Sequence, residues 1–273
     1  MRRHIDPSDL ARDDRFNRIS TEQRFSDRRQ VEQSNRIDPV ASDVHDRARR
    51  LMHGIFVGEI QALEGAGRTC FDFATAGESG SSDDPMAVPF ALKLDMARQC
   101  WDEARHCEIS IKLGDHMGSE IGEFFESTTL FEAACHADPV FRLAGVNRAL
   151  EGLAIDVFNG MKEFGSAMTD PVLEFCEDWM LADEVTHVKM GSTWLREVTK
   201  NDKDRQTRAL DFQKVVDGLF NFRGQRGEDP DSSIRLARKF REMAGFTTIE
   251  VDEIAEMSRQ AKAETAALAT AAA

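Results

Sequence analysis

The sequence predicts an all-α protein built on four long helices, and three observations support this prediction. Apolar residues recur every three or four positions through four long segments, the period of a helix with one buried face. No stretch alternates apolar and polar residues for more than a few positions, so no extended strand is expected. Two of the four segments carry the same pattern, Asp-Glu-x-x-His, at residues 102–106 and 183–187.

Length, composition and charge narrow the functional classes. The chain has 273 residues, of which 41% are hydrophobic, and this is typical of a globular protein with a sizeable core. No uninterrupted apolar run could cross a bilayer, so no membrane partner is expected. The formal net charge of −14 argues against a nucleic-acid partner, because phosphate binding needs a basic face.

Two further features concern the compartment and the available chemistry. The five cysteines include no Cys-x-x-Cys pair, and the first residues lead into more charge rather than into the apolar segment of a secretory signal. We therefore expect a cytoplasmic protein with reduced thiols. Tyrosine is absent, which excludes a mechanism based on a stored tyrosyl radical or a phenol ligand.

The chain divides into three parts. Residues 1–40 are rich in arginine and aspartate and show no sustained period, so we expect a charged N-terminal arm, either disordered or wrapped on a partner. Residues 41–200 hold the four periodic segments. Residues 201–273 should form a C-terminal helical extension. Its helices are expected near 203–222, 231–245 and 248–266.

The first two helices each carry polar residues within an apolar stripe. The first is expected over residues 42–75, with Glu59 in the middle of its buried face, where a glutamate needs a partner. The second is expected over residues 89–114 and carries Glu103 and His106 on its buried face.

The third and fourth helices begin with the same signal. An Asp-Pro pair at 138–139 and again at 170–171 supplies an N-cap residue and a proline suited to the first turn. The third helix carries Glu151 within its apolar stripe, and the fourth carries Glu184 and His187.

Residue counts place these polar side chains at one level of the bundle. Glu59 lies about 16 residues before the end of its helix, and Glu103 lies about 14 residues after the start of the next. At about 1.5 Å per residue, the two glutamates differ in height along the bundle by about 3 Å. Glu151 and Glu184 are each about 13 residues from the turn that joins their helices. The linker between the two hairpins is long enough to cross the bundle.

These side chains form a candidate site for two metal ions. A glutamate and a histidine three positions apart lie on one helix face. Bundles that bind two metals use such a pair on two helices and a single glutamate on the other two. These ligands suit Fe(II) or Mn(II) and would accept Zn(II). The predicted ligands are Glu59, Glu103, His106, Glu151, Glu184 and His187.

The ligand set resembles that of the ferritin-like di-iron carboxylate superfamily. The Asp-Glu-x-Arg-His form at 102–106 is similar to that of bacterial multicomponent monooxygenase hydroxylases. Within the superfamily, the chain is most similar to a bacterial branch described only as a ferritin-like domain of unknown function. There, elements like those at 220–221 and 244–246 recur. The resemblance implies a ferritin-like four-helix bundle with a long crossover between helices two and three, followed by C-terminal helices.

The resemblance also implies a function. It indicates an O2-activating non-haem di-iron oxidase or oxygenase that hydroxylates, desaturates or N-oxygenates a small organic substrate. Two Fe ions are the expected cofactors, with Mn as the alternative at either position, and Glu103 and Glu151 are the candidate bridging ligands. O2 or peroxide would be the co-substrate, a separate electron donor protein could supply electrons, and the chain could form a homodimer.

Three other functions stay open. A di-manganese enzyme could disproportionate peroxide, and Mn content would reveal it. A ferroxidase or iron-handling protein is less favoured, because storage members commonly lack the second histidine. A non-catalytic helical interaction protein would have no need of six polar core residues, each costly when unpaired.

Five further residues surround the predicted ligands. Asp102 and Asp183 each lie four residues before a ligand histidine and could orient an imidazole, or could lie on the helix surface. Cys100, Cys107 and Met180 could line a substrate pocket or pack in the core.

Overall fold

The computed structural model describes residues 43–77, 84–124, 129–219, 226–228, 232 and 234–271. The predicted N-terminal arm at 1–40 and the element at 220–221 lie outside these residues.

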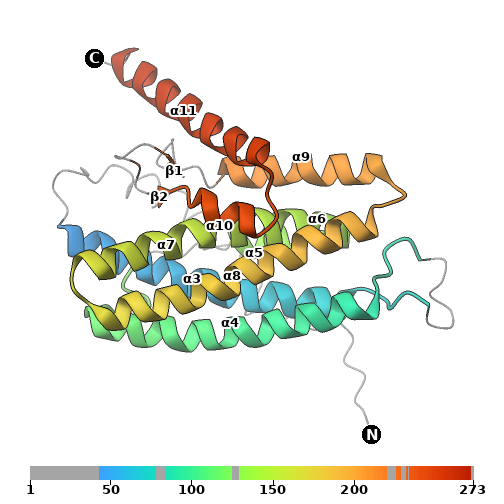
Figure 1. Ribbon diagram of the computed structural model, residues 1–273, viewed down its shortest axis with the longest axis horizontal. Coiled ribbons are helices and arrows are strands. Elements are labelled where there is room, and N and C mark those ends of the chain that lie inside the picture. The colour runs from blue at the N-terminus through green and yellow to red at the C-terminus, as the bar shows by residue number, and fades with distance from the viewer. Residues whose placement is uncertain are drawn as a thin grey trace, which may run out of the picture.

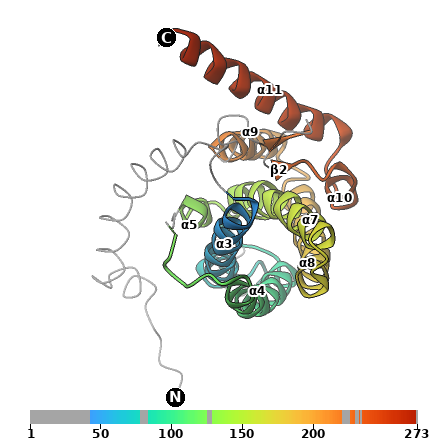
Figure 2. The ribbon, with the colours of Figure 1, turned by 90° about the vertical axis from the view of Figure 1, so that its left-hand side faces the viewer.

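Two helical hairpins form the bundle (Figure 1). In the first, α3 (Val44–Asp72) packs along α4 (Phe90–Met117). In the second, α7 (Glu151–Ala167) packs along α8 (Pro171–Val198). Viewed end on, these helices surround a common interior (Figure 2). The prediction of an all-α bundle is confirmed.

The third segment is not a uniform α-helix. It begins as α6 (Pro139–Arg142), continues as the π-helix η1 (Leu143–Leu150) and then becomes α7. A π-helix widens each turn, and such turns occur frequently at functional sites. At Gly191 of α8, an added Cβ would lie 2.4 Å from the Cβ of Asn147, so only glycine lets α8 approach η1 this closely.

The linker between the hairpins crosses the length of the bundle. It leaves α4 at one end and reaches α6 at the other, and it includes the short helix α5 (Thr129–Ala134), which packs on α3 (Figure 1). As a result, α4 and α8 run in opposite directions.

The expected start signals cap their helices. The carboxylate of Asp138 accepts a hydrogen bond from the backbone of Val140, and Asp170 accepts from Val172 and Leu173. Both aspartates satisfy amides that have no partner within the helix. Pro89, expected in the first turn of its helix, is instead the residue before it.

The C-terminal part covers one side of the second hairpin (Figure 1). Its elements are α9 (Lys203–Leu219), β1 (Arg226–Gly227), β2 (Ile234–Arg235), α10 (Arg238–Met243) and α11 (Thr248–Ala271). Its buried residues Phe246 and Ile254 belong to the same apolar core as Ile155 and Leu181 of the bundle. Within the described part of the chain, no helix has the length and apolar character needed to span a membrane.

The helix predicted over 231–245 is wrong in its first half. Strand β2, which pairs in parallel with β1, occupies part of this segment, and the helix begins only at Arg238. The backbone amide of Leu236 donates to Gly227, and that of Ala237 donates to the buried Asp156 at 2.9 Å. These partners satisfy both amides outside a helix.

Candidate metal centre

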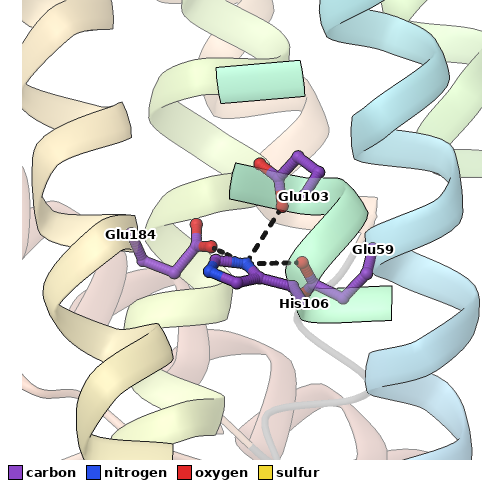
Figure 3. A group of neighbouring side chains, drawn as sticks. All are labelled: Glu59, Glu103, His106 and Glu184. Atoms are coloured by element: carbon purple, nitrogen blue, oxygen red, sulfur yellow. Dashed lines mark hydrogen bonds and ion pairs between the residues drawn. The ribbon is translucent and has the colours of Figure 1, made fainter. Parts of the chain in front are cut away.

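The structure brings all the predicted metal ligands together inside the bundle, where none is more than 5% exposed. They form two quartets, and within each quartet one ligand atom from every residue lies within 4.8 Å of the others. The first quartet is Glu59, Glu103, His106 and Glu184, and the second is Glu103, Glu151, Glu184 and His187. Figure 3 shows the first quartet, whose members come from α3, α4 and α8.

Glu103 and Glu184 belong to both quartets. Each of these two glutamates could therefore contribute to both metal positions. The expectation that Glu103 and Glu151 bridge stays a prediction; of the two, only Glu103 belongs to both quartets. The two shared glutamates are those of the two Glu-x-x-His motifs.

Each imidazole turns its Nδ1 atom towards the carboxylates. The Nδ1 of His106 lies 3.0 Å from Glu59, 3.1 Å from Glu103 and 3.2 Å from Glu184 (Figure 3). The Nδ1 of His187 lies 3.2 Å from Glu103 and 3.5 Å from Glu184. These nitrogen atoms are the ones that a metal ion between the glutamates would contact.

The other imidazole nitrogen contacts an aspartate of the opposite motif. The Nε2 of His106 lies 3.3 Å from Asp183, and the Nε2 of His187 lies 3.3 Å from Asp102. A hydrogen bond from Nε2–H to a carboxylate leaves the Nδ1 lone pair for a metal. The sequence placed each aspartate near the histidine of its own helix, but the antiparallel course of α4 and α8 pairs them crosswise.

Arg105 ties the two aspartates to each other. Its Nη2 donates to Asp102 and lies 3.3 Å from Asp183, and its guanidinium lies 4.8 Å from the ring centroid of Trp179. Burial acts to raise the pKa of Asp102, but the hydrogen bond to His187 and the charge of Arg105 hold it below its ordinary value. Asp102 is therefore an ionised acceptor.

Two amide side chains that the sequence analysis missed also hold the carboxylates. The Nε2 of Gln99 donates to Glu151 at 2.6 Å and to Glu103 at 3.1 Å. The Nδ2 of Asn147, in η1, donates to the Gln99 oxygen at 2.6 Å. Gln99 precedes Glu103 by four residues and Asn147 precedes Glu151 by four, so helical spacing was the available signal.

A family model described as "Protein of unknown function (DUF455)" matches residues 8–252. The chain belongs to the DUF455 family. No curated protein and no solved structure matches it. The family description states no activity, so the function of this DUF455 protein has to be argued from its site.

Without a cation, the charges of the centre depend on where its protons lie. Burial opposes the charged form of Glu103 and Glu184, but the neighbouring imidazoles hold the pKa of both below the ordinary value. Burial and neighbouring carboxylates raise the pKa of Glu59 and of Glu151 well above the ordinary value. Burial opposes the charged form of His106 and His187 too, but the surrounding carboxylates outweigh it and raise the pKa of both. These shifts favour protonated Glu59, Glu151, His106 and His187 in the metal-free DUF455 centre, and a bound metal would displace protons from its ligands.

The donor atoms fit a metal ion. The carboxylate oxygens of Glu184 and the Nδ1 of His187 are buried and make no hydrogen bond to any described residue; Nδ1 and one Glu184 oxygen have only the ion-pair contacts given above. Buried polar atoms without a hydrogen bond are costly, and a cation between the carboxylates would satisfy these. Either quartet of this DUF455 protein could hold a metal ion.

The residues expected near a substrate have different surroundings. Met180 is completely buried in the main apolar core. Cys100 and Cys107 are half-buried free thiols, and burial raises the pKa of Cys107 to about 12, so it stays protonated.

Proposed function

We propose that this DUF455 protein is an O2-activating non-haem di-iron oxidase or oxygenase that acts on a small organic substrate. The observation that carries the proposal is the pair of buried quartets that share Glu103 and Glu184. Two adjacent metal ions need such shared carboxylates, and the likeness to ferritin-like di-iron proteins supports iron as the metal.

Each quartet supplies a complete set of ligands. Glu59 and His106 would bind only the first ion, and Glu151 and His187 would bind only the second. The shared glutamates, Glu103 and Glu184, would contribute to both. Two iron ions, when bound, would supply the activation of O2. The role of the chain is to orient the imidazoles through Asp102 and Asp183 and to keep bulk water out of the interior.

The proposal also covers the source of electrons and the identity of the metal. Reducing equivalents would come from a separate donor protein or from the substrate itself. The same carboxylate and imidazole ligands would accept Mn(II), so metal content distinguishes an oxygenase from an enzyme that disproportionates peroxide.

The test loads the metal-free protein with Fe(II) under anaerobic conditions and follows O2 consumption. We expect the loaded wild type to consume O2 much faster than the same Fe(II) free in buffer, and Glu184→Ala to behave like free Fe(II). His45→Ala, which changes an exposed histidine, is the control and should behave like the wild type. O2 consumption by the wild type no faster than by free Fe(II) would contradict the proposal, and peroxide disproportionation by Mn-loaded protein would replace it.

A further inference from the structure

Glu177 is a buried carboxyl group that the metal centre does not use. It lies on α8 and is completely buried, and neither of its oxygens makes a hydrogen bond to a described residue. Burial raises its pKa well above the ordinary value, which favours the neutral, protonated form. Burial of an unpaired carboxyl group costs free energy, and an apolar residue at this position would avoid that cost. This cost points to a role for Glu177 beyond packing.

Glu177 lies close to the metal centre. It precedes Glu184 by seven residues, which places it on the same helix face about 10 Å along the axis. Along α8, Glu177 is six residues from Asp183, which contacts His106, and ten residues from His187, so it lies on the side of the centre where His106 is.

A second buried polar group lies at nearly the same level. Ser110 follows His106 by one turn of α4 and is 1% exposed, and its hydroxyl makes no hydrogen bond to a described residue. The pairs Asp102–His187 and His106–Asp183 fix how α4 runs past α8. This register places Ser110 and Glu177 within about one helical turn of the same level.

Ser110 also forms part of a crevice at the surface. The crevice, between α3 and α4, has a volume of about 20 Å³ and is lined by His53 and Ser110 on its inner side and by the exposed residues Glu120 and Ile121. A polar cavity needs about 10–15 Å³ to hold a water molecule, so one water fits beside the Ser110 hydroxyl.

We propose that Glu177 relays protons between the metal centre and solvent, and that Ser110 and a water molecule in the crevice connect Glu177 to the surface. Each step moves one proton between oxygen or nitrogen atoms, so no oxidant or reductant takes part. The relay rests on the proposed metal centre, where metal binding must release the protons of the ligands and reduction of O2 must consume protons.

Proton release on metal binding tests Glu177 without any need for turnover. Metal-free protein is mixed with Zn(II) in a stopped-flow instrument with a pH indicator, and bound Zn(II) is counted separately. We expect Glu177→Gln to bind as much Zn(II) as the wild type and to release its protons at least ten-fold more slowly. The amide of glutamine replaces the neutral acid at equal size but cannot accept and pass on a proton.

Two further variants complete this test. Glu177→Asp keeps the carboxyl group and should restore most of the rate. Glu174→Gln makes the same change one turn earlier on α8, at a half-buried position, and should release protons at the wild-type rate. A wild-type rate in Glu177→Gln would overturn the relay alone, whereas wild-type protein that binds no Zn(II) would overturn the metal centre and the relay with it.

Infrared spectroscopy tests the path through Ser110. In Zn(II)-loaded protein, the carboxylic acid band that disappears in Glu177→Gln belongs to Glu177, and it shifts when D2O replaces its proton. We expect this shift to be at least ten-fold slower in Ser110→Ala and close to the wild-type rate in Ser110→Thr, which keeps the hydroxyl. An equal rate in Ser110→Ala and wild type would overturn the path through Ser110.

Discussion

The Nε2 atom of His187 on α8 lies 3.3 Å from the carboxylate of Asp102 on α4, and His106 and Asp183 repeat this pair in the opposite direction. Each imidazole of the centre is therefore oriented by the helix that supplies the other imidazole. The two motifs depend on each other across the interface between α4 and α8.

This crossed arrangement predicts which metal ion each aspartate affects. Asp102→Asn should weaken the metal of the His187 quartet, and Asp183→Asn that of the His106 quartet, each by about 10–100-fold in affinity. Competition with a chelator measures the two affinities. The double variant with Asp102→Asn and His187→Ala should lose little more than His187→Ala alone, because both changes remove the same unit. Additive losses would contradict the pairing.

Gln99 should stabilise the metal-free protein. Gln99→Leu removes the donor that serves Glu151 and Glu103 and leaves Asn147 without its acceptor. A buried polar group that loses its partner costs about 1–3 kcal/mol, so the free energy of unfolding should fall by that amount. Urea denaturation measures the change, and an unchanged midpoint and slope would rule out this role.

The stability of the metal-free protein should decrease as the pH rises from about 6 to 8. Glu59, Glu151, His106 and His187 have raised pKa values in the folded chain, so the folded state binds more protons than the unfolded state in this range. The pKa of Glu103 is held well below its ordinary value, so this group is ionised in both the folded and the unfolded state between pH 6 and 8. Its contribution to stability therefore does not change over this range. Melting temperatures at several pH values test this trend.

Metal should reverse this pH dependence. Bound metal needs the ligands without their protons, so affinity should increase with pH and binding should release protons. Calorimetric titration in buffers of different ionisation enthalpy counts the released protons. Binding without proton release would mean that the ligands are already deprotonated in the metal-free protein.

Asp156 should hold the C-terminal part to the bundle. Its carboxylate accepts hydrogen bonds from Arg226, Arg241 and the backbone of Ala237, all buried. Asp156→Asn leaves buried guanidinium groups short of a counter-charge, which costs about 3–5 kcal/mol of unfolding free energy. Glu163→Gln, at an exposed position on the same helix, is the control and should cost little. Equal denaturation midpoints for the two variants would contradict this role.

Much of this architecture follows from local patterns. Apolar period and Asp-Pro signals located the four long helices, and the Glu-x-x-His spacing located the ligands, because both depend on residues that are neighbours on one helix. The complete burial of Asp156 could not be predicted from the sequence, because it depends on contacts with Arg226 and Arg241, about 70 and 85 residues further along the chain.

Other features needed the tertiary structure. The π-helix at Leu143–Leu150 has the same apolar residues as an α-helix would, so the sequence pattern does not distinguish them. The crossed pairing of Asp102 with His187 depends on the antiparallel course of α4 and α8. Glu177 precedes Glu184 by seven residues, so helical spacing alone could have placed it on the buried face of this helix.

The number of metal ions per chain tests the central claim most directly. It is measured by plasma mass spectrometry after expression with iron and manganese available. The two quartets predict about two ions in the wild type, and fewer than one in Glu184→Ala, because both quartets share this residue. Glu197→Ala, an exposed position on the same helix, should retain about two. A wild type without bound transition metal, or the same content in Glu184→Ala, would contradict the account.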